Sequence, residues 1–152
     1  MHYVVDVAFH EAADATIAAL GKSEFSAVHA SLRSALDALT KADPEAAHAV
    51  RDTFIGVEIL VKVITDSNQD LTERSVSSQL KPVIDRVYSN ADQIAKGAAA
   101  TTLHSLIDWV NACHKYRHGH NVQAPADPPL ELAILLVNNG FGFARWLAAL
   151  SR

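Results

Sequence analysis

The stretch LHSLIDWVNACHKYRHGH, residues 103–120, decides how we expect this chain to fold. Apolar residues recur along it at helical spacing, at Leu103, Ile107 and Val110. The next two positions on that stripe are His114 and Arg117. Polar groups at core positions are costly unless they are paired. The stretch therefore predicts a buried helix that carries a cluster of chemically active side chains at its end.

The composition places the chain among globular proteins. Its 152 residues are 49% hydrophobic and 20% charged, which suits a single domain over residues 1–152 with a sizeable core. The net charge of -4 and the pI near 6.0 argue against a dedicated nucleic-acid binder, so we expect no DNA partner.

Three further features predict a cytoplasmic protein that does not enter a membrane. The sequence shows no signal peptide, and no run reaches the ~18 consecutive apolar residues that a membrane span needs. A lone cysteine, Cys113, cannot form an intramolecular disulfide and fits a reducing compartment. Because it lies on the apolar side of its helix, we expect it to be a small core residue.

Helical periodicity runs through the whole chain, and no segment shows sustained alternation of period two. We therefore predict an all-α fold, one helical bundle of about five to seven helices. Helices are expected within residues 3–20, 25–39, 44–64, 71–79, 83–88, 98–118 and 129–150.

Capping residues, prolines and glycines set the expected helix boundaries. Caps are expected at Ser23 and, in front of prolines, at Asp43 and Asp127. Pro82 is expected to interrupt the fourth helical region, and Gly97 to separate it from the alanine-led helix that follows. In the last helix, small residues predict a close helix crossing at Gly140 and Gly142, and a break at Gly140 is the alternative.

A carboxylate sits at the edge of the widest apolar face. Glu58 has Phe54, Ile55 and Val61 as helical neighbours, and Lys62 lies four residues on. One interpretation is an ordinary Glu–Lys pair worth about 0.2–0.5 kcal/mol. The other is a carboxylate aimed at the Arg/His cluster.

The end of the opening stretch has the residues that metal-free RNA cleavage needs. Gly119 suits the position after a helix end, so Arg117 and His118 would occupy the final turn and His120 the exit loop. An imidazole can move protons near neutral pH, and a guanidinium can hold a phosphate. The helix dipole alone also favours cations there, which gives a purely structural alternative.

Metal binding is the competing chemistry. His114, His118 and His120 give the spacing H-x3-H-x-H. No carboxylate stands at a recognisable ligand spacing, and an arginine within the cluster would repel a cation. We therefore predict no metal and no cofactor.

Three short motifs together resemble the HEPN superfamily: VEILVK at residues 57–62, YRHG at residues 116–119 and PLELA at residues 129–133. The likeness is greatest to HEPN-type domains of bacterial abortive-infection and related defence proteins, and it covers roughly residues 44–150. The resemblance implies an all-α bundle that is often a homodimer.

Active HEPN members are metal-independent endoribonucleases, in which two subunits join their motifs and the RNA 2′-hydroxyl attacks the adjacent phosphate. Their signature is an arginine, a polar residue, and a histidine five to seven positions after the arginine. Arg117 and His118 match the first two positions. The third departs from the signature, because the window holds residues 122–124, VQA, and the nearest histidine is His120.

Two functions therefore remain open. In an endoribonuclease of a defence or toxin-type system, Arg117 would hold phosphate, and His118 and His120 would transfer protons. Glu58 would orient the arginine or a histidine. The expected RNA contacts are Lys62, Lys115 and Tyr116. In a non-catalytic module, Arg117 and Glu58 would form a buried ion pair, and the domain would form a homodimer or bind a partner protein.

Overall fold

The computed structural model describes residues 7–117 and 127–151, and these residues form helices joined by short turns and loops. The elements are α1 (Val7–Ala19), the 3-10 turn η1 (Ser23–Phe25), α2 (Ser26–Thr40), α3 (Ala46–Thr65), α4 (Glu73–Val87), α5 (Gln93–Arg117) and α6 (Leu130–Leu150). The prediction of an all-α bundle of five to seven helices is confirmed.

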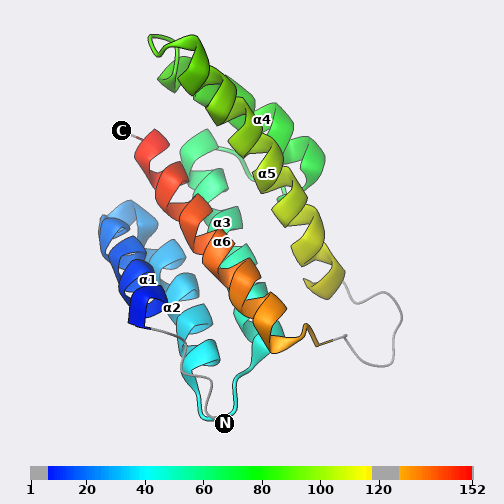
Figure 1. The fold of residues 1–152 in the computed structure, drawn as a ribbon. Helices are drawn as coiled ribbons and strands as arrows, with labels where there is room; N and C mark the ends of the chain where they lie inside the picture. The colour runs from blue at the N-terminus through cyan, green and yellow to red at the C-terminus, as the bar shows by residue number, and fades with distance from the viewer. Residues whose placement is uncertain (1–6, 118–126, 152) are drawn as a thin grey trace.

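The helices form two groups (Figure 1). α1, α2, α3 and α6 pack side by side, and α3 lies between α2 and α6. α4 and α5 form a hairpin that packs along this group, chiefly through contacts of α5 with α3 and α6. The end of α5 that carries Arg117 lies beside the chain that links α3 to α4, since His114 of α5 is hydrogen-bonded to Leu71 in that link.

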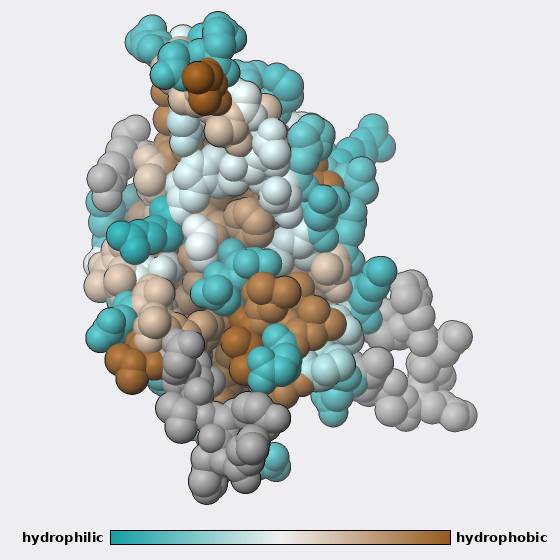
Figure 2. All heavy atoms as spheres, in the orientation of Figure 1, coloured by the Kyte–Doolittle hydropathy of each residue, from teal (hydrophilic) through white to brown (hydrophobic). Residues whose placement is uncertain are grey.

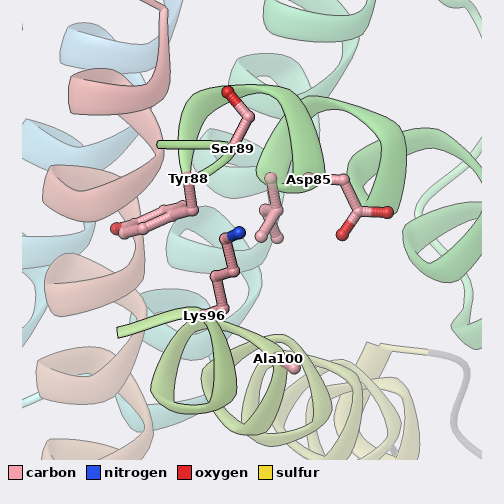
Figure 3. A pocket seen from close by; sticks show the side chains of 6 residues that line it. Asp85, Tyr88, Ser89, Lys96 and Ala100 are labelled. Carbon is pink, nitrogen blue, oxygen red and sulfur yellow. The ribbon is translucent and has the colours of Figure 1, made fainter. Parts of the chain in front are cut away.

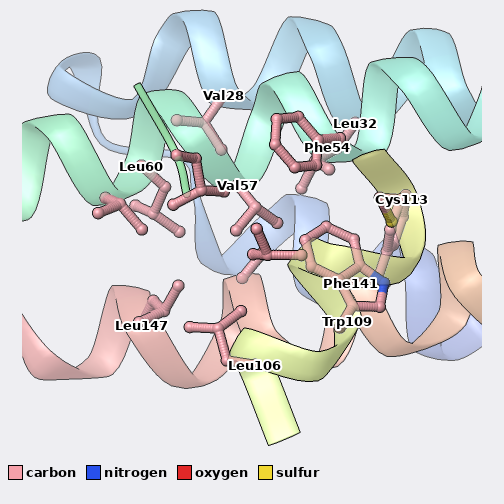
Figure 4. Close-up of a cluster of buried hydrophobic side chains, with 14 of the residues drawn as sticks. Val28, Leu32, Phe54, Val57, Leu60, Leu106, Trp109, Cys113, Phe141 and Leu147 are labelled. Atoms are coloured by element: carbon pink, nitrogen blue, oxygen red, sulfur yellow. The ribbon is translucent and has the colours of Figure 1, made fainter. Parts of the chain in front are cut away.

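One hydrophobic cluster joins all six helices. Figure 4 shows its centre, where side chains of α2, α3, α5 and α6 meet. The fully or almost fully buried members there include Val28, Leu32, Phe54, Val57, Leu60, Leu106, Trp109, Cys113, Phe141 and Leu147. The expectation that Cys113 is a core residue is confirmed.

α6 crosses α3 and α5 at a glycine. A Cβ added at Gly140 would overlap Thr53 Cγ2 of α3 and lie 2.7 Å from Trp109 Cζ2 of α5. Trp109 Nε1 also donates a hydrogen bond of 2.8 Å to the Leu136 carbonyl of α6. The predicted close crossing is confirmed at Gly140, and α6 continues through it without a break. It is wrong at Gly142, where an added Cβ would meet nothing within 4 Å.

The expectation that Pro82 interrupts the fourth region is wrong, because α4 runs unbroken through it. Proline removes only the bond to the carbonyl of residue 78. Both Pro82 and Ser78 are exposed, so water can reach that carbonyl. Apolar residues on both sides of the proline, including Leu80 and Val83, are buried on one face and keep the helix continuous.

Gly97 does not separate helices either, since it lies inside α5. The helix begins earlier because Asp92 Oδ1 accepts a hydrogen bond of 2.7 Å from the Ala95 N–H. That side chain caps the first turn, and the weak preference of one exposed glycine for helix does not offset it.

The three expected caps are also wrong. η1 occupies the position where Ser23 was expected to cap a helix. α3 begins at Ala46 rather than after Asp43, because the Glu45 N–H donates to the Ala38 carbonyl of α2 at 2.9 Å and Glu45 is the residue before the first turn. α6 begins at Leu130 rather than after Asp127, since a residue that precedes proline is driven out of the helical region.

Among the described helices, α6 alone is long and apolar enough to cross a membrane by length and composition. A helix buried in the core of a bundle can be equally long and equally apolar, so length and composition alone do not identify a membrane span. α6 packs against α1, α3 and α5 and buries nine of its residues.

Candidate functional site

Glu58 occupies a buried position on α3 with 7% of its surface exposed. Its Oε2 accepts a hydrogen bond of 2.8 Å from the backbone N–H of Leu71, in the link between α3 and α4. The same oxygen lies 3.4 Å from Arg117 Nη1, and Lys62 Nζ lies 3.9 Å from Oε1. Each carboxylate oxygen therefore has at least one partner, and the predicted Glu58–Arg117 pair is confirmed.

Arg117 is the last residue of α5 and turns back over the core. Its guanidinium carbon lies 4.6 Å from the centre of the Phe54 ring, and 26% of its side chain is exposed. The cation therefore has three favourable neighbours: the aromatic face, the Glu58 carboxylate and the negative end of the α5 dipole.

His114 lies one turn before Arg117 on the same face. Its Nε2 is 2.8 Å from the Leu71 carbonyl, and its ring packs edge-on against Phe54 with the two centroids 5.0 Å apart. Because a carbonyl can only accept, Nε2 carries the proton in this contact. His114 is therefore a hydrogen-bonded residue at the edge of the core.

Leu71 is the residue that the sequence did not single out. It is 1% exposed, its N–H bonds to Glu58 of α3 and its carbonyl to His114 of α5. We call Glu58, Leu71, His114 and Arg117 the Leu71 latch. The latch fastens the α3–α4 link to two helices, and the only signal for it in the sequence is an apolar residue among the polar residues 66–75.

The positive and negative charges around the Leu71 latch are equal in number. Lys62 Nζ lies 3.6 Å from Asp70 as well as near Glu58, so two cations, Lys62 and Arg117, face two carboxylates. Such a cluster has no net positive charge among the described residues. It therefore offers little long-range attraction to a phosphate backbone.

Of the remaining predicted site residues, the structure describes Lys115 and Tyr116. Lys115 is exposed, and Tyr116 is half-buried against the core. His118 and His120 lie outside the described residues, so their predicted roles stay predictions. Residues 7–117 and 127–151 contain no group of three or more histidine, cysteine or acidic side chains that could hold a metal. The metal interpretation needs His118 and His120, so it stays an untested alternative.

Cys113 lies next to the latch in sequence but offers no chemistry. Its side chain is buried in the core, and that burial raises the pKa of its thiol to about 12. The reactive form is the thiolate, which is scarcely populated at neutral pH with such a pKa.

A pocket of about 380 Å³ lies between α4 and α5 at the end of the hairpin opposite the latch (Figure 3). Lys96 points into it, and Tyr88 forms one wall. The Tyr88 hydroxyl accepts a hydrogen bond of 2.9 Å from Trp146 Nε1, which ties α4 to α6 at this end. The pocket shares no residue with the latch.

No family model matches the sequence, and no curated protein or solved structure matches it either.

Proposed function

We propose that this chain is a non-catalytic, cytoplasmic helical module that acts by binding another protein chain. In this proposal it is similar to the HEPN-type domains of bacterial abortive-infection and related defence proteins. The supporting observation is the Leu71 latch, in which Arg117, the arginine predicted to hold phosphate, is paired with a buried carboxylate.

The energetics of the latch favour a structural role. If Arg117 bound a phosphate, it would have to leave or share Glu58, which is 7% exposed. A buried carboxylate that loses its partner costs several kcal/mol, on the order of 3–5 for a fully buried pair. A phosphate would have to supply that energy in a cluster whose charges already balance.

A paired assay of stability and cleavage tests this proposal. We expect Arg117→Ala to lower the free energy of unfolding by about 1–3 kcal/mol, because it leaves Glu58 without its cationic partner. We expect the wild type to leave single-stranded RNA intact in the presence of a chelator. Cleavage by the wild type that disappears in a folded Arg117→Ala variant would contradict the non-catalytic role.

A metal-independent endoribonuclease is the second candidate, and the exposure of Arg117 favours it. About a quarter of that side chain, 26%, remains accessible, and His118 follows directly in the sequence. In this candidate Glu58 orients Arg117 toward the phosphate, His118 and His120 transfer protons, and Lys62, Lys115 and Tyr116 contact RNA.

The endoribonuclease candidate predicts different results in the cleavage assay. Cleavage must survive chelation and leave cyclic phosphate ends, and His120→Ala must abolish it without changing the unfolding temperature. Loss of cleavage on chelation would point to a metal instead, and equal cleavage by wild type, Arg117→Ala and His120→Ala would indicate a contaminating nuclease.

A further inference from the structure

The outer face of α6 carries a straight stripe of exposed residues. Its members follow one another at spacings of four and three: Glu131, Leu135, Asn138, Gly142, Arg145 and Ala149. At 100° per residue they stay within about 40° of one line along the helix. Heptad spacing of this kind is the seam that one helix presents to another in a coiled coil. We call these six residues the α6 stripe.

Near the N-terminus of α6, large apolar side chains are exposed on and beside the stripe, whose other members include Glu131, Asn138 and Arg145. Leu135 is 53% exposed and the adjacent Leu132 is 38% exposed. Figure 2 shows the result as a hydrophobic area over the N-terminal half of α6, broken by a few hydrophilic residues. Exposed apolar area rimmed by polar groups is typical of a surface that binds a partner.

The α6 stripe carries a charge near each of its ends. Glu131 and Arg145 are its only charged residues, and neither has an ion-pair partner among the described residues. They are opposite in sign and stand 14 positions apart. A second α6 running in the opposite direction would bring each of them beside its opposite.

The sizes of two residues on the stripe, Leu135 and Gly142, are also complementary between antiparallel helices. An added Cβ at Gly142 would meet nothing within 4 Å, so the glycine is a shallow hollow on an open surface. The exposed Leu135 is seven positions away on the same stripe. In the antiparallel arrangement that pairs Glu131 with Arg145, each leucine lies within one residue of the position opposite the hollow at Gly142 of the other helix.

The midpoint between Glu131 and Arg145 falls at Asn138, and the midpoint between Leu135 and Gly142 falls between Asn138 and Asn139, which are both exposed. A two-fold axis there would place the amides of one helix against those of the other. Side-chain amides can donate and accept at once. A single polar residue in an apolar seam is also a known way to fix the register of paired helices.

We propose that α6 binds α6 of a second copy of this chain, antiparallel and two-fold symmetric about Asn138–Asn139. This inference rests on the proposed binding role, since it names the partner. The pairing closes on itself and gives a dimer rather than a filament. Two helices of about 31 Å make a small interface, so we expect a dissociation constant of roughly 1–100 μM.

Filling the hollow tests the size match. In sedimentation equilibrium of the full chain, Gly142→Gln is expected to raise the dimer dissociation constant roughly 100-fold, because its side chain displaces Leu135 twice per dimer. The substitution meets no atom in the monomer, so the helical signal and the unfolding temperature should be kept or improved. Gly97→Gln is the matched control, since Gly97 is also an open helical glycine and lies on α5.

Exchanging the charges tests the direction of the helices. Glu131→Arg and Arg145→Glu are each expected to weaken the dimer about three- to tenfold, and the double variant should restore it. In a parallel pairing each residue would face its own copy, so the double variant would restore nothing.

Two results would overturn the inference: a wild type that stays monomeric at millimolar concentration, or a dimer that neither Gly142→Gln nor the charge exchange affects. RNA cleavage that depends on Arg117 would refute the proposed function while leaving the sedimentation result unchanged. The two proposals can therefore fail separately.

Discussion

Two of the contacts that hold α5 against α3 and α6 differ in chemistry. Near the middle of α5, Trp109 packs against Gly140 of α6, with one neutral hydrogen bond to a backbone carbonyl. At its end, Arg117 reaches Glu58 of α3 through an ion pair that is partly exposed to water. The first contact depends on shape and the second on charge.

The difference indicates which contact tolerates change. Close packing leaves no room for an extra methyl group, because neighbouring side chains are held by the rest of the core. When folding removes an ion pair from water, the attraction between its two charges offsets most of their desolvation cost. The pair therefore adds little net stability. We therefore expect the Gly140 contact to determine stability and the Glu58 contact to determine the arrangement of the α3–α4 link.

The largest effect is expected where the shape contact is broken. Gly140→Leu would place a side chain where even a Cβ overlaps Thr53 and lies 2.7 Å from Trp109. Overpacking of this kind costs about 1–3 kcal/mol and more when backbones must separate, so we expect a loss of roughly 3 kcal/mol or more. Urea unfolding followed by circular dichroism measures it.

Gly142 provides the control within the same helix. Gly142→Ala meets nothing within 4 Å and should raise the free energy of unfolding by about 0.8–1.0 kcal/mol through helix propensity alone. Similar stabilisation by Gly140→Ala would mean that the crossing of α6 over α3 and α5 is wrongly placed.

Removing the carboxylate is expected to have the next largest effect. Glu58→Ala leaves the Leu71 N–H without its acceptor and Arg117 without its anion. We expect a loss of about 2–3 kcal/mol, less than for a fully buried pair because Arg117 is 26% exposed. Hydrogen exchange should also show faster exchange of the Leu71 amide, since its bond is lost.

An exposed ion pair serves as the comparison for that variant. Asp14 and Arg33 lie 3.4 Å apart with 58% and 44% of their side chains exposed. Asp14→Ala is expected to change stability by less than about 1 kcal/mol. If both variants cost the same, the Leu71 latch is no more than a surface salt bridge.

Most of the fold could be predicted from the sequence because apolar periodicity is long in every helix. The wrong helix boundaries are those predicted from the local preference of a single residue, which contacts of the surrounding segment override. Pro82 and Gly97 are weak helix formers, yet burial around the first and the Asp92 cap before the second kept the helices intact. Local capping preferences likewise misplaced the starts of α3 and α6, whose positions depend on contacts elsewhere and on consecutive prolines.

The candidate site was predicted in part for a similar reason. In the sequence, Glu58 and Arg117 stand out as charged residues beside apolar stripes. Although 59 positions separate them in the chain, pairing them gives each charge a partner of opposite sign. The role of Leu71 could not be predicted, because the bonds are made by its backbone, which is the same in every non-proline residue. The sequence pattern did not reveal the α6 stripe, because Gly140 and Gly142 are both small residues in an apolar segment although they lie on different faces of the helix.

A smaller effect is expected from the neutral hydrogen bond of the first contact. Trp109→Phe removes the donor to the Leu136 carbonyl, but that carbonyl can still accept the helical bond within α6. The aromatic packing against Phe54, with ring centroids 6.0 Å apart, is largely kept. We expect a loss of about 1–2 kcal/mol, and a loss as large as that for Gly140→Leu would show that the bond, not the shape, holds α5.

The smallest effect is expected when both charges of the second contact are removed together. In Glu58→Gln with Arg117→Met, the glutamine oxygen can still accept from the Leu71 N–H, and the methionine can still pack on Phe54. Replacing a buried ion pair by well-packed neutral side chains is often neutral, so we expect a change within about 1 kcal/mol. Thermal unfolding and sedimentation equilibrium measure whether stability and self-association are kept. Both should match the wild type if the charges serve only to arrange the Leu71 latch, because α6 is untouched. A double variant that is stable and dimeric but has lost an RNA cleavage shown by the wild type would instead assign the charges to catalysis.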